Sequence, residues 1–573
     1  MPLAIDDIPT TATAQLGLWT GPREAVATAA EALRAALHDL THPVTLVSLN
    51  HQLALATGGS IHIGETSTAD TAADLPLCGF APALDPRHLG DPTFCSDHQL
   101  QFPYMTGSMA NGIASVELVE AVAKAGMLGA YGAAGQRIEV IRAAIERLQS
   151  TLRIPASDPS CLNRGRASVP VPGACLPYCF NLIHSPNEPL HEMRVVELYL
   201  EKNVALVEAS AYLDLTLPVV RYRVTGLHSD ADGKVIAKNR IIAKASRVEV
   251  ASKWFAPPPR KFVDELLKLG YITQEEAELS QFIPMAQDLT AEADSGGHTD
   301  NRPAITLIPT FIALRDRLQL EHHFDPRTTP LRIGAGGGIA TPASAAAAFA
   351  MGAAYIVTGS INQACVESGS SVFVRKMLAE AQQADVTMAP AADMFEMGVK
   401  LQVLKRGTMF AMRAAKLFEL YRAYASIDAI PAAERANLEK TIFRATLDEI
   451  WTKTRDFFQP FDPGQIVKAD RDAKHKMALI FRWYLGLSSR WANAGEPTRQ
   501  MDYQVWCGPA MGAFNEWTRG SFLEKPENRK AAVVAMNLMH GAAVMTRLAA
   551  LRSQGVRLDA TLTNIQPREL ETI

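Results

Sequence analysis

The sequence predicts an α/β protein built on a (β/α)₈ TIM barrel, with a small N-terminal region and an additional α-helical domain at the C-terminal end. Short apolar runs alternate with amphipathic helical stretches from about residue 96, and eight such units fit before residue 375. After residue 375 apolar residues recur at three- and four-residue spacing, which is typical of helices. The expected domains are therefore residues 1–95, 96–375 and 376–573.

Composition and charge restrict the class of protein. With 573 residues, 48% of them hydrophobic and 20% charged, the chain has the composition of a soluble globular enzyme. Its 56 basic and 60 acidic residues give a net charge of −4, so we expect neither nucleic acid nor a membrane as a partner. Seven scattered cysteines and an N-terminus without a secretory signal favour a cytoplasmic location. Cys175, Cys179 and His184 lack a fourth ligand at a zinc-like spacing, so no metal site is expected.

The expected elements follow in chain order. A helix over residues 22–39 and a strand at VTLVSLN, residues 44–50, form the N-terminal region, which shows no catalytic pattern. The eight barrel strands are expected at residues 103–110, 126–132, 177–183, 204–210, 240–246, 287–294, 331–337 and 353–359. Helices fit between many of them, most clearly at residues 115–125, 260–270 and 305–318.

Two segments depart from this alternation of strands and helices. Residues 219–240 carry Asp232-Gly233 between two alternating runs, which predicts a β-hairpin insertion. Residues 333–366 contain no charged side chain but consist mostly of Gly, Ala, Ser and Thr. Because these small residues gain little from transfer into lipid, we expect a buried loop, helix and strand there instead of a membrane span.

The stretch from Gly334 to Ser360 gives the strongest chemical signal. Three successive glycines, Gly336–Gly338, let backbone N–H groups approach a ligand, and Thr341-Pro342 is a good N-cap and first residue for a helix. Thr358-Gly359-Ser360 ends the next strand, and the loops after strands seven and eight are the usual phosphate site of barrels. A simple tight turn is the alternative. The pattern is neither a Rossmann fingerprint nor a Walker motif.

Other candidate residues lie at the ends of further strands. YMTGSMANGIAS, residues 104–115, either admits a flat ligand against its small residues or only turns from strand to helix. Asn181 interrupts an apolar run, and a buried amide must bind neighbouring backbone or a ligand. Lys244 could stabilise a reduced, anionic flavin ring or pair with a carboxylate, which is slightly favoured. His298, in EADSGGHTDN, follows the sixth strand and suits proton transfer, although a solvated loop histidine is the alternative.

These motifs together resemble a known superfamily. GSMA near strand one, Asn181, DSGGHTD, GGGIATP and the pair Gly359-Ser360 are similar to nitronate monooxygenases and bacterial flavin-dependent enoyl reductases. The longer stretches FNLIHSPNEP, VELYLEKNVALVEASAYLDLT, EADSGGHTDNRP and APAADMFEMGVKLQVLKRGTMFAMRA resemble the PfaD family. That family comprises trans-acting enoyl reductases of polyunsaturated fatty acid synthases and trans-acyltransferase polyketide synthases. The resemblance covers about residues 80–460, with a weaker C-terminal part.

The resemblance implies FMN at the top of the barrel and NADPH as the reductant. His298 would be the active-site histidine, although Thr299 and Asp300 follow it where the superfamily usually has another glycine nearby. The flavin ring and its phosphate would be held by Ser108, Met109, Ala110, Asn181, Lys244, Gly297, Gly337, Gly338, Gly359 and Ser360.

The implied reaction is reduction of the α,β double bond of enoyl thioesters on acyl carrier protein, within a polyketide or fatty acid synthase. The resemblance leaves a homodimer open. Two alternatives remain at this point. The first is a nitronate monooxygenase-like flavin oxidase, in which His298 removes a proton next to a nitro group. The second is a non-catalytic docking protein, which would not need both the glycine loops and the histidine.

Overall fold

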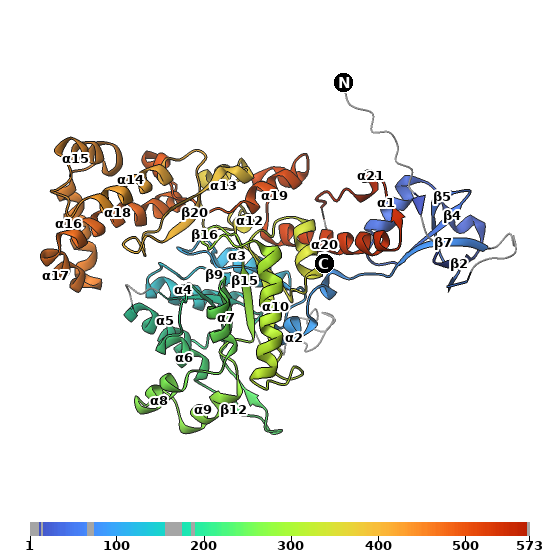
Figure 1. Cartoon of the computed structure of the whole chain (residues 1–573), viewed down its shortest axis with the longest axis horizontal. Helices are drawn as coiled ribbons and strands as arrows, with labels where there is room; N and C mark the ends of the chain where they lie inside the picture. The colour runs from blue at the N-terminus through green and yellow to red at the C-terminus, as the bar shows by residue number, and fades with distance from the viewer. Residues whose placement is uncertain (1–10, 13–14, 66–73, 155–174, 185–188, 570–573) are drawn as a thin grey trace.

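The computed structural model describes residues 11–12, 15–65, 74–154, 175–184 and 189–569, and a closed barrel of eight parallel strands lies at its centre (Figure 1). Each barrel strand pairs with the next barrel strand in the sequence, and the eighth barrel strand pairs with the first. In chain order the barrel strands are β8 (Tyr104–Thr106), β9 (Leu128–Tyr131), β10 (Cys179–Ile183), β11 (Leu206–Ser210), β14 (Arg240–Ala245), β15 (Asp288–Glu292), β17 (Arg332–Gly336) and β18 (Ile356–Thr358). The predicted barrel is confirmed, and each strand lies within its predicted range.

Alternation along the strands separates the barrel interior into layers. On β11, Leu206 packs in the barrel core, Glu208 is fully buried above it, and Ser210 lines the cavity at the carboxyl end. The opposite end is closed by α2 (Pro92–His98), whose His98 binds Asp288 at 2.9 Å. Arg332 donates to the same carboxylate, so a buried ion cluster stabilises the bottom of the barrel.

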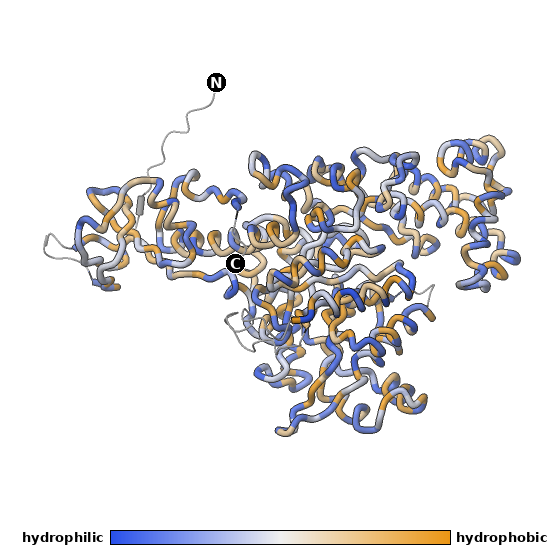
Figure 2. Tube along the Cα trace, turned by 180° about the vertical axis from the view of Figure 1, so that it is seen from behind, coloured by the Kyte–Doolittle hydropathy of each residue, from blue (hydrophilic) through white to orange (hydrophobic). Residues whose placement is uncertain are grey.

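Helices cover the outside of the barrel. They are α3 (Val116–Lys124), α4 (Ile138–Thr151), α5 (Pro189–Glu201), α6 (Leu217–Val224), α7 (Val248–Phe255), α8 (Arg260–Lys268), α9 (Gln274–Leu279), α10 (Ala304–Glu321) and α11 (Pro342–Ala350). The predicted helices at 115–125, 260–270 and 305–318 correspond to α3, α8 and α10. Short hydrophobic and hydrophilic stretches alternate along the peripheral helices, as expected for helices that bury one face (Figure 2).

The eighth helix position is filled from the far end of the chain. α20 (Ala531–Ser553) packs against both α11 and α3, between the seventh and first barrel units. By length and composition α20 could cross a membrane, but 72% of its most apolar 18-residue window is buried inside the protein. The barrel therefore uses residues well beyond 375, because α20 supplies the apolar surface that the short α12 (Ser360–Gln363) cannot.

The predicted hairpin insertion at 219–240 needs correction. Its first part is the helix α6, which begins with a Thr216 cap and Pro218 in the first turn. Val219, Val220 and Tyr222 are buried against the barrel, and this packing overrides the alternating pattern of VVRYRV. Only β12 (His228–Ser229) and β13 (Val235–Ile236) form a hairpin, around Asp232-Gly233.

The segment after residue 375 is mostly helical, as predicted, but its described part also contains three strands. β19 (Val386–Pro390) and β20 (Lys400–Leu404) form an antiparallel sheet with β16 (Gly297–His298), which follows the sixth barrel strand. A helical unit follows and lies at one side of the barrel (Figure 1). It consists of α14 (Phe410–Ala423), α15 (Ala432–Leu438), α16 (Leu447–Phe461), α17 (Pro463–Arg471) and α18 (Ala473–Ala494), and α13 (Val372–Ala379), α19 (Ala510–Thr518) and α21 (Ala560–Thr563) flank it in the chain.

The N-terminal region forms a six-stranded antiparallel sheet on the other side of the barrel (Figure 1). Its order is β3 (Val26–Ala27), β5 (Gln52–Ala56), β4 (Val44–Leu49), β7 (Asp74–Ala81), β2 (Gly17–Thr20) and β6 (Ser60–Ile63), while β1 (Thr11–Ala12) pairs with β21 (Val556–Arg557). The predicted strand at VTLVSLN is β4. The predicted helix at 22–39 is too long, because Val26–Ala27 pairs with β5 and α1 spans only Ala30–His38. Arg547 of α20 binds backbone carbonyls of this region and fixes it to the barrel.

Candidate active site

A cavity of about 830 Å³ lies at the carboxyl ends of the barrel strands, where barrel enzymes carry their functional residues. The structure brings every predicted site residue to its wall. These residues are Ser108, Met109, Ala110, Asn181, Lys244, Gly297, His298, Gly337, Gly338, Gly359 and Ser360.

The glycine segment forms an open cradle of N–H groups at one end of the cavity. Gly337 has φ +82°, and a Cβ there would lie 2.6 Å from the backbone carbon of Ala293, so only glycine fits. A Cβ at Gly338 or Gly359 would meet nothing within 4 Å. Among the described residues, no acceptor binds the N–H groups of Gly338, Ile339, Gly359 and Ser360. Such a set of N–H groups suits an anion.

The helix behind the cradle begins as the sequence predicts. Thr341 caps α11, Pro342 is its first residue, and Ser344 completes a capping box. Ser344 Oγ accepts hydrogen bonds from the N–H groups of Ala340 and Thr341 at 3.0 Å. The side chains of the cap thus accept hydrogen bonds from N–H groups at the start of α11, and the N–H groups of the preceding glycines stay available to a ligand.

The loop after the first strand is tied down by a residue that the sequence analysis missed. Glu208 is fully buried, and its Oε2 accepts hydrogen bonds from the Ser108 N–H at 2.8 Å and from the Ser108 hydroxyl. Its Oε1 has no partner among the described residues. The N–H groups of Met109 and Ala110 also donate to no described residue, so these two amides are the ones available to a ligand.

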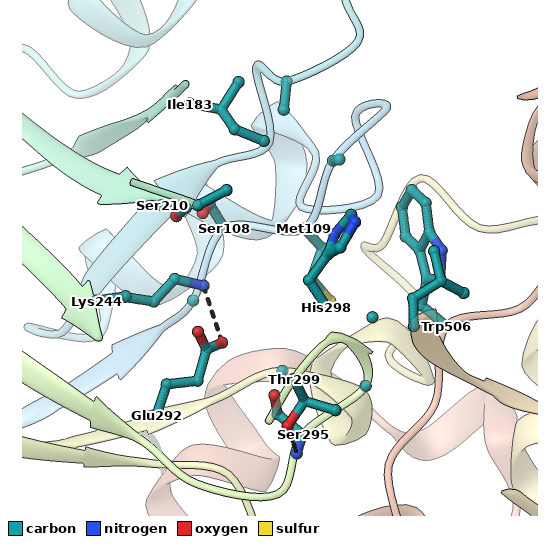
Figure 3. Close-up of a pocket in the computed structure, with 18 of the residues that line it drawn as sticks. Ser108, Met109, Ile183, Ser210, Lys244, Glu292, Ser295, His298, Thr299 and Trp506 are labelled. Atoms are coloured by element: carbon teal, nitrogen blue, oxygen red, sulfur yellow. Dashed lines mark hydrogen bonds and ion pairs between the residues drawn. The ribbon is translucent and has the colours of Figure 1, made fainter. Parts of the chain in front are cut away.

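Asn181 and Lys244 both find protein partners. Asn181 Nδ2 donates to the Glu208 carbonyl at 3.2 Å and to Ser210 Oγ at 3.1 Å, so neighbouring groups satisfy its buried donor. Lys244 Nζ lies 3.3 Å from Glu292 Oε1, which confirms the predicted pairing with a carboxylate (Figure 3). Burial lowers the pKa of Lys244, but the charges of Glu292 and Glu208 outweigh it and raise the pKa above its ordinary value. Lys244 is therefore a fixed cation at the cavity wall.

His298 lies on β16 and points into the cavity near Trp506 and Met109 (Figure 3). Its Nε2 lies 3.2 Å from Oδ1 of Asp393, a residue that sequence reasoning missed. Burial opposes the charged imidazolium, but the hydrogen bond and the charge of Asp393 raise the pKa of His298 above 6.5. The histidine is thus partnered and lines a cavity, which excludes the alternative of a solvated loop residue.

The two residues after His298 organise the loop instead of the reaction centre. Asp300 binds Arg247 at 2.9 Å and Ser246 at 2.6 Å, and the hydrogen bond from Arg247 lowers the pKa of Asp300 to about 2. The Thr299 hydroxyl accepts from the Asn301 N–H at 3.0 Å within the turn. Thr299 and Asp300, which follow the histidine where the superfamily usually has another glycine nearby, therefore do not move His298 out of the cavity wall.

Segments from the C-terminal part close the cavity from above. Met388, Met394 and Leu401 come from the β19–β20 pair, and Leu485 comes from α18. Trp506 follows the helical unit, and the N–H of Gly508 donates to Ser360 Oγ at 3.1 Å. Residues that follow the eighth barrel strand thus complete the wall, and the sequence analysis did not predict them as site residues.

Comparisons with known proteins identify relatives of the chain. A family model described as the inserted helical domain of [acyl-carrier-protein] S-malonyltransferase matches residues 424–503. The chain is 48% identical over 471 residues to a polyunsaturated fatty acid synthase component of Thraustochytrium sp., covering 81% of this chain and 30% of that protein. It is 41% identical over 457 residues to polyketide biosynthesis protein PksE of Bacillus subtilis, covering 80% and 56%. It spans less than two thirds of either relative.

A solved structure matches more completely. The enoyl reductase domain of MlnA, from the macrolactin biosynthesis cluster of Bacillus amyloliquefaciens, superposes with a TM-score of 0.73. The match has 37% identity and covers 82% of this chain and 99% of that domain. On this identity and coverage, the chain belongs to the family of enoyl reductase domains that the MlnA domain represents.

Proposed function

We propose that the protein is an FMN-dependent enoyl reductase that reduces the α,β double bond of enoyl thioesters on acyl carrier protein. The observation that carries the proposal is one cavity that unites the glycine cradle, the Ser108 loop and His298. Membership of the enoyl reductase family supports the reaction type. The names of two relatives, a polyunsaturated fatty acid synthase component and a polyketide biosynthesis protein, support acyl thioesters as the substrate class.

FMN fits the residues that line the cavity. Gly337, Gly338, Gly359 and Ser360 would hold its phosphate. Their segments present N–H groups that no acceptor among the described residues binds, and a side chain at Gly338 or Gly359 would enter open space that the phosphate could occupy. The amides of Met109 and Ala110, together with Ser108, Asn181, Lys244 and Gly297, would hold the ring. When bound and reduced by NADPH, FMN supplies the hydride for the β-carbon of the enoyl thioester.

The side chains supply the rest of the reaction. His298 would donate the proton that the α-carbon receives, because its hydrogen bond to Asp393 and the charge of that carboxylate favour the protonated imidazole. Lys244 would stabilise negative charge that develops in the cavity. Trp506, Met394 and Leu485 would exclude water from the reacting atoms.

The proposed partner is an acyl carrier protein within a polyketide or polyunsaturated fatty acid synthase. The carrier would present the thioester to the cavity at the carboxyl ends of the barrel strands. Comparing carrier-bound enoyl chains of both classes would decide between the two pathways, and comparing NADPH with NADH would decide the reductant.

An anaerobic spectrum of the purified, FMN-loaded protein tests the proposal. NADPH should bleach the visible flavin band, and a short enoyl thioester should restore it without oxygen. If the thioester leaves the reduced flavin unchanged while oxygen and a nitronate turn it over, the protein is a nitronate monooxygenase-like oxidase. If the protein takes up no FMN, it acts as a docking protein and the proposal fails.

A further inference from the structure

Asp393 reaches His298 from a segment almost 100 residues further along the chain. It lies in the connection between β19 and β20, and β20 pairs with β16 so that His298 is opposite Leu401. The connection therefore folds back over the strand that carries the histidine. The distance of 3.2 Å between His298 Nε2 and Asp393 Oδ1 joins the two side chains at the cavity wall.

The contact leaves one ring nitrogen for a ligand. His298 Nδ1 makes no hydrogen bond to the described part of the chain, whereas Nε2 is engaged by Asp393. The His298 side chain is 35% exposed and lines the cavity, so a molecule in the cavity can approach it. A carboxylate on one nitrogen of a histidine fixes the ring orientation and stabilises its protonated form.

We propose that Asp393 is a positioning residue that holds His298 by Nε2 as an imidazolium, so that Nδ1 donates the proton to the α-carbon of the enoyl thioester. This inference rests on the proposed function, because it names the proton donor of that reaction. It assigns a catalytic purpose to the β19–β20 pair, which delivers the carboxylate from outside the barrel.

The proton transfer completes the reduction. Hydride supplied to the β-carbon would leave the electron pair of the double bond delocalised toward the thioester oxygen as an enolate. The enolate carbon then forms its bond to the proton of His298 Nδ1. The neutral imidazole recovers a proton from solvent. Asp393 remains ionised throughout and is not consumed.

Other charges around the pair favour the same protonation state. Glu292, at the end of the sixth strand, adds a negative charge that raises the pKa of His298, while Lys244 opposes it. Burial raises the pKa of Asp393, but the hydrogen bond and charge of His298 outweigh it and lower that pKa. Arg482 of α18 acts on Asp393 in the same direction and itself pairs with Glu396 at 3.3 Å.

Stopped-flow reoxidation of the reduced, FMN-loaded protein by a short enoyl thioester tests the inference across a pH series. Asp393→Asn should bind FMN and accept electrons from NADPH as the wild type does. Its reoxidation should be slower by about 10- to 100-fold, which is less than the roughly 10²–10⁴-fold loss expected without any acid. The loss of rate at high pH should begin at a lower pH, because the amide no longer holds the proton on His298.

Two further variants separate positioning from folding. Glu380→Gln changes an exposed carboxylate before β19, paired with Arg406 and outside the cavity, to an amide and should leave the rate and its pH dependence unchanged. Asp393→Glu should restore much of the rate and return the pH dependence toward that of the wild type. Asp393→Asn could instead fail to bind FMN, while Asp393→Glu binds it and shows the same pH dependence of the reoxidation rate as the wild type. In that case Asp393 is structural and the inference is overturned.

An unchanged pH dependence in a well-folded Asp393→Asn protein would also overturn the inference. That outcome differs from failure of the proposed function. If the function is wrong, the wild-type reduced flavin itself is not reoxidised by the enoyl thioester. If only the inference is wrong, the wild type is reoxidised and the Asp393→Asn protein behaves in the same way at every pH.

Discussion

Replacing Gly359 with Ala separates phosphate recognition from folding. Gly359 has φ −126°, so alanine meets no left-handed strain, and a Cβ there meets no atom within 4 Å. The protein without FMN should therefore unfold at the same temperature as the wild type. The new methyl group would occupy cavity space needed by the phosphate, and such overpacking costs about 1–3 kcal/mol. At about 1.4 kcal/mol per tenfold change, the FMN dissociation constant should rise about 5- to 150-fold.

Titration of flavin fluorescence checks this prediction, with riboflavin as the matched ligand that lacks the phosphate. Gly359→Ala should weaken FMN but leave riboflavin binding unchanged. Gly337→Ala is the contrasting variant, because its φ of +82° and a 2.6 Å approach to Ala293 place the cost in the fold itself. It should lower the unfolding temperature even without ligand. Equal weakening of riboflavin and FMN by Gly359→Ala, or no weakening of FMN, would refute the phosphate cradle.

Three other substitutions test the site and its support. His298→Ala should slow reoxidation of reduced flavin by an enoyl thioester by about 10²–10⁴-fold, with FMN affinity unchanged. Stopped-flow kinetics measures this rate, and an unchanged rate would mean that the histidine is not the acid. Glu208→Ala should lower the free energy of unfolding by about 3–5 kcal/mol, because the half-buried Ser108 N–H and hydroxyl lose their shared acceptor, the fully buried Glu208 carboxylate. Urea denaturation measures the difference, and a near-neutral result would contradict this account. Asp288→Asn should cost about 3–5 kcal/mol at pH 7. Burial raises the pKa of Asp288, but the charges of Arg332 and His98 outweigh it and hold the pKa far below 3.8. The stabilisation is therefore present above pH 3.8 and is lost as the pH falls toward the folded pKa. The difference in free energy of unfolding between Asp288→Asn and the wild type should therefore become smaller when urea denaturation is repeated at decreasing pH.

The barrel could be predicted because its strands carry a strong local signal. Buried parallel strands read as short apolar runs, and the runs around Tyr104–Thr106, Leu206–Ser210 and Arg332–Gly336 all proved to be barrel strands. The residues at their carboxyl ends then converge in any closed barrel, so one topological prediction placed Ser108, His298 and the glycine loops together.

Local pattern failed where distant packing decides the structure. Val219–Val224 alternates like a strand, yet it is a helix whose buried side chains pack on the barrel. Asp393 lies in a stretch that resembles the PfaD family, but nothing local identified it as a site residue, because its partner His298 lies 95 residues away and their contact depends on the pairing of β16 with β20. Glu208 did carry a signal, since an acidic residue within the apolar run VALVEAS must find a buried partner.

The position of α20 explains how the cavity roof is held over the cofactor cradle. Because α20 completes the barrel after β18, the β19–β20 pair, the helical unit and the Trp506 segment form an insertion within the eighth barrel unit. Both ends of this insertion are thus anchored in the barrel wall, between β18, which ends at Thr358, and α20. The hydrogen bond from Gly508 to Ser360 connects the returning segment directly to the cradle, while Asp393 connects the outgoing segment to His298. The two ends of the insertion thus contact the cavity at different places, one at the glycine loops and the other at His298.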